Sequence, residues 1–596
     1  MSLERGPGMG RRAALGWLAL VVAAALALRT VGIGYLLPHQ VWFDSLVLHD
    51  EVAVLRHGGD ESFRQHGLGL YPQFIPRLVA LLPSEREDAP VPETLEEHLE
   101  RAQAPWVRVN QVVALLSLLV VPATYLLARR FMERSWSVVA SALMATSVLH
   151  LWFSQQGRPH SAEVSLTLLA VLASLRLRRK PVISSYLLAG AAMSLAVGAL
   201  QSGVATLLPF AAAILLRVRR GTRASTAWAI GSILLVVVAV RILYPFVFEH
   251  RGSTASDSPG AIEVEGSGLS FMGHSIPLSR FQGDGFGNIL LSLLSYDPLI
   301  SVLALVGGAL AIVELARERG PLDRDLRGDL GVVLAYAVPY LVVVGLYNGS
   351  GQRFGIPLLP FLACLAAFGL RGIRRLGFES SRRAVAMRFA SVAIVVSVLA
   401  TQAFAAWKLS WIRSRPDTAT QAAIWIREHI RPGTDRILVS HALEVPLFQT
   451  SEALERNESI LHHPRKVWFD YQWDLLPSAP RPAEQYELVQ LLADGGAARK
   501  RIQDDPAGYL RSLDASWLVY EVHPSFDWAD FAGLREVLPG IGRRVARFSP
   551  DRVDRWKETP LAHQGYDPQP FPIAWFLRVL DARCTGSVIE IWKLDR

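Results

Sequence analysis

Long apolar runs alternate with short arginine-bearing segments along the first 410 residues of this chain. The runs hold roughly 18 to 22 residues, about what a helix rising ~1.5 Å per residue needs to cross a hydrocarbon layer ~30 Å thick. After about residue 410 the runs stop. The pattern predicts about eleven transmembrane helices, at 13–33, 109–128, 137–154, 161–176, 182–199, 203–217, 226–245, 297–315, 330–347, 354–370 and 389–407.

The remaining polar stretches predict where a globular part and a site could form. Residues 417–430 have helical periodicity with Asp417 and Thr418 as start signals, and a Pro-Gly turn separates them from a strand at 436–441. We therefore expect a C-terminal α/β domain over 411–596, following an α-helical polytopic membrane domain over 1–410. Within the long loop 34–108 we expect a polar helix at 92–103 and an amphipathic stretch at 70–83 suited to a membrane surface. The segment 251–269 is the nearest to a flexible loop.

Lysine and arginine in the short connections set the expected orientation. If the N-terminus is inside, the inner segments carry twenty-four of these residues, whereas the outer connections, apart from the first long loop, carry only Arg158, Arg251, Arg280 and Arg353. Positive residues accumulate on the cytoplasmic side of membrane proteins. The odd number of spans then places the C-terminal domain outside, on the periplasmic or extracellular face of a bacterial inner membrane.

Composition narrows the function classes. The chain is 51% hydrophobic and only 19% charged, which is too apolar for a soluble enzyme of 596 residues. Its net charge of +8 comes mostly from the short inner segments, so it indicates topology and no nucleic-acid partner. Cys364 lies in an apolar run and Cys584 in the tail, so no disulfide framework or cysteine metal cluster is expected.

Three acids in the first loop, PHQVWFDSLVLHDEVAVLR (38–56), are candidates for a general base or an acceptor-binding group: Asp44, Asp50 and Glu51. Asp44 follows Trp42 and Phe43, aromatic residues suited to a membrane interface. Asp50 and Glu51 lie further along and are expected to be free to face solvent. The alternative for each is a solvated acid in a polar loop.

Two arginines stand against the charge rule at the outer ends of spans. Arg158 lies in HLWFSQQGRPHSAE (150–163) and Arg353 in YNGSGQRFGIPLLPFL (347–362). An arginine in such a place usually has an anionic partner, and its planar fork suits a phosphate or carboxylate. For Arg158 the alternative partner is a lipid headgroup or Glu163. His160 is a candidate proton carrier or phosphate donor, or a hydrogen-bonded interfacial histidine.

Three segments together resemble the bacterial GT-C glycosyltransferases, in particular the family 39-like proteins related to protein O-mannosyltransferases and lipid A aminoarabinose transferase. They are the first-loop acid after LP, the stretch 124–161 with FSQQGRPHS, and GQRFGIPLLPFLACLAAFGL (351–370). The resemblance implies an inverting transferase that moves a sugar from a polyprenyl-phosphate carrier to a protein, lipid or glycan acceptor at the outer face. It also implies that the first-loop acid is the catalytic or acceptor-binding group, and that outer arginines hold the lipid-linked phosphate.

The sequence departs from the family pattern at this acid, which is commonly followed by glutamate. If the family acid is aligned by its distance from the first span and the preceding proline, it corresponds to Asp44, whose neighbour is Ser45. If it is aligned by the Asp-Glu dipeptide, it corresponds to Asp50-Glu51. We favour Asp44, and we leave open the acceptor and a possible divalent metal. The rival interpretation is a transporter or flippase of a lipid-linked or anionic solute, which typically shows two related halves and polar mid-membrane positions.

Overall fold

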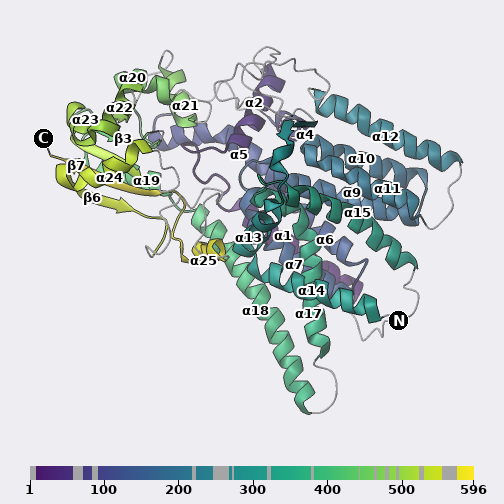
Figure 1. The fold of residues 1–596 in the computed structure, drawn as a ribbon. Helices are drawn as coiled ribbons and strands as arrows, with labels where there is room; N and C mark the ends of the chain where they lie inside the picture. Colours follow the sequence, from purple (N-terminus) through teal and green to yellow (C-terminus); the bar gives the residue numbers. More distant parts are fainter. Residues whose placement is uncertain are drawn as a thin grey trace.

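The computed structural model describes residues 9–57, 71–83, 92–217, 223–245, 268–271, 274–317, 324–376, 382–441, 443–461, 466–476, 482–491, 496–522, 529–552 and 573–595. A large helical body is followed by a smaller part built on a β-sheet, and the two lie side by side (Figure 1). Most of the predicted flexible stretch 251–269, and parts of the loop 34–108, fall outside the described residues.

The helical body contains all the apolar helices. Its elements are α1 (Arg11–Thr30), α2 (Phe43–His57), α4 (Phe74–Ala80), α5 (Leu95–Leu118), α6 (Val120–Ala128), α7 (Arg134–Ala145), α8 (Val148–Ser154), α9 (Pro159–Arg179), α10 (Ile183–Ala199), η1 (Gln201–Thr206), α11 (Leu207–Leu215), α12 (Arg223–Leu243), β1 (Gly268–Phe271), β2 (His274–Pro277), η4 (Leu278–Arg280), α13 (Asp284–Tyr296), α14 (Pro298–Arg317), α15 (Arg324–Leu346), α16 (Gln352–Gly355), η5 (Ile356–Leu358), α17 (Leu359–Leu376) and α18 (Arg382–Arg413).

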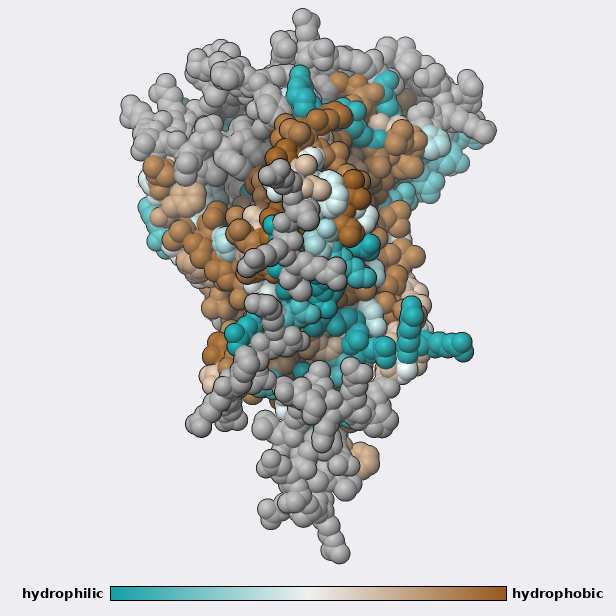
Figure 2. Space-filling model, turned by 90° about the vertical axis from the view of Figure 1, so that its right-hand side faces the viewer, coloured by the Kyte–Doolittle hydropathy of each residue, from teal (hydrophilic) through white to brown (hydrophobic). Residues whose placement is uncertain are grey.

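Every predicted span falls on a helix. Among the described residues, eight helices are long and apolar enough to cross a membrane, and the bent pair α7–α8 makes a ninth. The two further predicted spans fall on shorter apolar helices, 183–199 and 201–215. Figure 2 shows brown, apolar side chains over much of one face of the molecule. On α12 such exposed side chains include Ile230, Leu234 and Val238, as expected of a helix that faces lipid.

The predicted polar helix at 92–103 is the start of a longer element. Thr94 and Glu97 form a capping box, in which each side chain satisfies a backbone N–H of the other residue. From there α5 continues without interruption into the second predicted span. The amphipathic stretch 70–83 forms α4, whose Ile75 and Val79 are buried in a cluster with residues of α2, α5 and α9.

A buried carboxylate fixes the bend of 53° between α7 and α8. Asp297 accepts hydrogen bonds from the Ser147 hydroxyl (2.6 Å), the Val148 backbone N–H (2.8 Å) and the Gln402 amide (2.6 Å). These bonds satisfy donors at the start of α8 that have no partner within the helix. The bend sets the direction of α8 and therefore the place of the turn that follows it.

The C-terminal part is the predicted α/β domain. Its elements are α19 (Thr418–His429), β3 (Arg436–Val439), α20 (Ser451–Leu461), α21 (Val467–Leu475), β4 (Glu487–Gln490), α22 (Gly496–Asp504), α23 (Pro506–Ser512), β5 (Trp517–Val522), α24 (Ala529–Ile541), β6 (Gly542–Phe548), α25 (Ala574–Asp581) and β7 (Val588–Leu594). The sheet order is β4-β3-β5-β7-β6, with β3 parallel to β4 and β5, and β7 antiparallel to β5 and β6.

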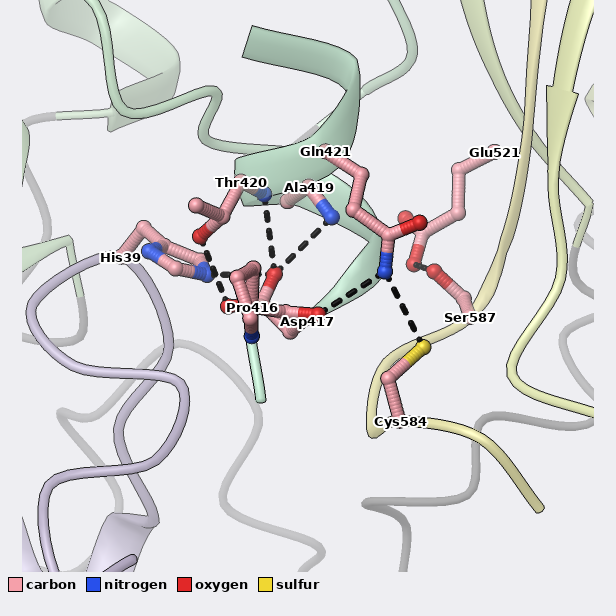
Figure 3. Close-up of polar contacts among 9 residues, drawn as sticks. All are labelled: His39, Pro416, Asp417, Ala419, Thr420, Gln421, Glu521, Cys584 and Ser587. Carbon is pink, nitrogen blue, oxygen red and sulfur yellow. Dashed lines mark hydrogen bonds and ion pairs between the residues drawn. The ribbon is translucent and has the colours of Figure 1, made fainter. Parts of the chain in front are cut away.

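Helices cover both faces of this sheet, because successive strand residues point to opposite sides. Leu438 and Leu518 pack with α22, α23 and α24, whereas Ile437 and Val519 pack with α19. Several contacts tie the domain to the helical body, and two of them involve its first and last helices. His39, after α1, bonds Asp417 at the start of α19 (Figure 3), and Trp575 of α25 stacks on Tyr296 of α13.

Candidate active site

The first-loop acid and the first outer arginine meet in the structure. Asp44 lies in the first turn of α2 and Arg158 at the N-cap of α9, and they form an ion pair across 114 positions of sequence, in which Nε and Nη2 of Arg158 both contact Asp44 Oδ2. Asp44 is 5% exposed and Arg158 is 2% exposed. Asp44 is therefore not a solvated loop acid, and the partner of Arg158 is Asp44 and not Glu163, which accepts a bond from Thr167 (2.7 Å).

A tyrosine that the sequence did not single out completes the environment of Asp44. The Tyr71 hydroxyl donates a hydrogen bond of 2.6 Å to Asp44 Oδ1, while Arg158 binds Oδ2. Burial alone would raise the pKa of Asp44. The charge of Arg158, with those of His160 and Arg353 and the Tyr71 hydrogen bond, outweighs burial and lowers that pKa to about 2. Asp44 is therefore a carboxylate throughout the neutral range.

Ser45 stands where the GT-C family commonly has glutamate, and its side chain stabilises a neighbouring turn. Its hydroxyl donates to the backbone carbonyl of Gln156, two residues before Arg158. Gly157 follows with φ of +59°, and a Cβ there would lie 2.4 Å from Asn110 Oδ1. The turn that presents Arg158 therefore requires glycine and is held directly by the residue next to Asp44.

Arg353 lies on α16, and its charge favours the ionised forms of Asp44 and Tyr71. No hydrogen bond or ion pair within the described part of the chain joins it to either residue. Its guanidinium carbon lies 5.1 Å from the Phe354 ring centroid, and among the described residues it has no hydrogen bond or ion pair. Arg353 is partly exposed.

Two further polar atoms near Asp44 have no protein partner. Arg158 Nη1 and His160 Nδ1 are buried and make no hydrogen bond within the described part of the chain. His160 is 8% exposed and lies in the first turn of α9, with its ring 6.0 Å from that of Phe153. Unmade hydrogen bonds of buried groups are costly, so these two atoms have the capacity to bind a ligand.

The other two first-loop acids lie further along α2. Asp50 is partly exposed, with Oδ1 3.7 Å from His49 Nδ1. The expectation that Glu51 is free to face solvent is wrong, because this residue is 0% exposed. Glu51 is seven positions beyond Asp44, so the 3.6-residue repeat of the helix returns it to the buried face.

The described residues contain no group of three or more His, Cys, Asp or Glu side chains placed to hold a metal ion. Both cysteines are free thiols. The Asp44 carboxylate is thus surrounded by the Tyr71 hydroxyl, by two arginine guanidinium groups and by the His160 ring. Such a set can take a proton at the carboxylate and hold an anion at the guanidinium groups.

Comparison of the sequence with protein-family models and with curated proteins gave no match. Several solved structures are similar. The apo oligosaccharyltransferase of Archaeoglobus fulgidus is 11% identical with a TM-score of 0.48, over 91% of this chain and 74% of that one. ArnT from Cupriavidus metallidurans, bound to undecaprenyl phosphate, is 14% identical with a TM-score of 0.41, over 90% and 97%.

A third similar structure is the mycobacterial arabinofuranosyltransferase AftD, 16% identical with a TM-score of 0.39, over 99% of this chain and 42% of that one. These three neighbours are GT-C glycosyltransferases, the superfamily that the sequence motifs resemble. Superpositions with TM-scores below 0.5 transfer no residue roles.

Proposed function

We propose that this protein is a glycosyltransferase that moves a sugar from a polyprenyl-phosphate-linked donor to an acceptor at the outer face of a bacterial inner membrane. The observation that carries the proposal is the buried Asp44–Arg158 pair with donor capacity left over at Arg158 Nη1 and Arg353. Both the acid and the arginines come from the three segments that resemble the GT-C enzymes. The C-terminal domain lies on the same outer side, with the N-terminus in the cytoplasm.

The donor phosphate is bound by the two arginines. A polyprenyl carrier cannot leave the bilayer, so its phosphate must be met by cations at the ends of spans. Arg353 supplies a guanidinium that no described residue pairs, and Arg158 supplies Nη1 while its other nitrogens hold Asp44. When the bond between the anomeric carbon and the phosphate oxygen breaks, the electron pair leaves with the phosphate. Fixed positive charge at that point stabilises the transition state.

Asp44 is the proposed base. The acceptor hydroxyl or amine attacks the anomeric carbon from the side opposite to the phosphate, forms the new glycosidic bond, and gives its proton to Asp44. With a pKa of about 2, Asp44 is a weak base while Arg158 is bound to it. A donor phosphate competes for the Arg158 guanidinium and weakens the electrostatic attraction between Arg158 and Asp44. Filling the donor site therefore makes Asp44 more basic at the moment when a base is needed.

The test is transfer itself. Purified protein in lipid nanodiscs is incubated with polyprenyl-phosphate sugars and extracts of envelope acceptors, and loss of sugar from the lipid is followed. We expect time-dependent loss that requires Asp44. Movement of intact donor across a sealed bilayer without cleavage would instead favour the transporter interpretation. For orientation, a reporter that is active only in the cytoplasm, fused after Lys408, should be silent, and a bright signal would overturn the topology.

A further inference from the structure

A second cationic pocket lies where the last span joins the C-terminal domain, and the proposed transfer reaction does not use it. The cavity is about 300 Å³, and three arginines line it together with Gln421, Ser549 and Cys584. Arg415 comes two residues after the end of α18, Arg547 from β6, and Arg583 from the turn between α25 and β7. Three elements that are distant in sequence thus bring guanidinium groups to one opening.

The charge of this pocket is mostly unbalanced. Arg547 shares Glu590, at 3.6 Å, with Arg544. Arg415 and Arg583 are exposed, and no carboxylate of the described residues pairs with either of them. Gln421 forms one wall, held by its bonds to the Pro416 carbonyl (2.8 Å) and to Cys584 Sγ (3.2 Å) (Figure 3).

The pocket is close to the level where lipid headgroups lie. Phe404, Trp407 and Trp411 form a row along α18, with neighbouring ring centroids 5.6 and 6.3 Å apart. Phe404 and Trp407 are about half exposed, and exposed aromatic residues at the end of a span mark the membrane–water interface. The Arg415 guanidinium carbon lies 4.7 Å from the Trp411 ring centroid. One helical turn therefore separates the aromatic row from the pocket.

We propose that this pocket binds a phosphate group, and that its source is the headgroup of an anionic phospholipid whose chains lie along α18. Guanidinium groups from three sides match the several oxygens of a phosphate. The exposed apolar face of α18 supplies the surface for the acyl chains. A lipid held here bridges the last span and the sheet, because Arg415 follows the span whereas Arg547 and Arg583 belong to the C-terminal domain.

The test measures binding of phosphatidylglycerol to the full chain in neutral detergent by native mass spectrometry and by calorimetric titration. The variant is Arg415→Ala/Arg583→Ala, and the matched control is Arg431→Ala/Arg543→Ala, which removes two exposed arginines outside the pocket. We expect the pocket variant to bind phosphatidylglycerol roughly tenfold or more weakly than the control, since each basic residue near an anionic headgroup contributes ~1 kcal/mol. Thermal unfolding of both variants checks that they fold.

Inorganic phosphate and phosphatidylcholine distinguish the sources of the ligand. Weakened binding of phosphatidylglycerol in the pocket variant, with phosphatidylglycerol bound more tightly than phosphatidylcholine by the unchanged protein, supports the lipid source whether or not inorganic phosphate also binds more weakly. Weakened binding of inorganic phosphate, with phosphatidylglycerol bound no more tightly than phosphatidylcholine, supports a phosphate site but overturns its lipid source. If the pocket variant and the control bind all three probes equally, the phosphate site itself is wrong.

Discussion

The two ends of α9 each carry a buried ion cluster, and the clusters differ in what they leave unsatisfied. At the N-terminal end Arg158 holds Asp44 of α2. At the C-terminal end, roughly 30 Å away along the helix, Arg178 and Arg179 share Asp329 of α15. Both carboxylates are almost fully buried, at 5% and 0% exposure.

The C-terminal cluster is satisfied within the protein. Arg178 reaches Asp329 at 2.8 Å, and its Nη2 also donates to the Asp325 carbonyl at 2.5 Å. Gly328 makes room for it, because a Cβ there would lie 2.2 Å from Arg178 Nη1. In the N-terminal cluster, Arg158 Nη1 and His160 Nδ1 make no hydrogen bond to any described residue, and the charge of Arg353 acts on Asp44. The C-terminal cluster therefore holds α9 to α15, and we propose that the N-terminal cluster binds a ligand.

The largest expected effect that separates the two clusters is on catalysis. Asp44→Asn should lower transfer per folded molecule by ~10²–10⁴-fold, the range for loss of a general base. Asp50→Asn and Glu51→Gln are the matched changes on the same helix and should do less. Transfer is measured in membranes that carry each variant at equal amounts. The assignment of Asp44 is wrong if Asp44→Asn keeps near-normal transfer while Asp50→Asn or Glu51→Gln is inactive. The base would then be Asp50 or Glu51.

Removing the acid of the other cluster should act on folding instead. Asp329→Asn removes the buried carboxylate of Arg178 and leaves it only the half-exposed Asp325 carboxylate, at 3.6 Å. Breaking a buried ion pair typically costs ~3–5 kcal/mol of the free energy of unfolding. Transfer per folded molecule should stay normal, since this end of α9 takes no part in the reaction. Thermal unfolding in detergent and transfer normalised to folded protein measure the two quantities. A catalytic loss without a stability loss would contradict the division between the clusters.

Arg353→Ala sharpens the comparison, because this residue has no hydrogen bond or ion pair to lose among the residues that the structure describes. We expect the KM for the donor to rise ~10–100-fold, the equivalent of one charge-assisted hydrogen bond, with no change in thermal stability. Arg353→Lys should restore part of the loss, since lysine keeps the charge but not the planar fork. Arg280→Ala, an exposed arginine predicted on the same side, is the control. Equal effects of Arg353→Ala and Arg280→Ala would indicate a general charge effect and not a site.

The smallest expected effect is a change of pH dependence. The low pKa of Asp44 contributes stability that is present above the unfolded value of ~3.9 and is lost only as pH falls through about 2. This pair should therefore add no slope to stability between pH 5 and 8. In Arg158→Gln burial dominates and raises the pKa of Asp44, so stability should fall as pH rises. Melting temperatures at pH 5 and 8 test this, and parallel slopes for both proteins would contradict it.

Local signals in the sequence were enough to place most elements. The eleven apolar runs coincide with helices, because a segment that crosses lipid must satisfy its backbone hydrogen bonds within itself, as a helix does. Asp417 caps α19 through bonds to Ala419 and Thr420, three residues away at most, and β3 begins at Arg436 as the strand pattern predicts. The division of domains near residue 410 and the inside N-terminus stay predictions.

The sequence by itself thus determined the membrane class, the helices, the sheet-forming tail and the short list of outer acids and arginines. Only the tertiary structure decided that Asp44 and Arg158 pair, that Tyr71 joins them and that Glu51 is buried. It also decided that Arg415, Arg547 and Arg583 share one cavity. The reason is physical: a helix or a cap depends on neighbours within a few residues, whereas an ion pair across 114 positions exists only once the chain has brought both groups out of water.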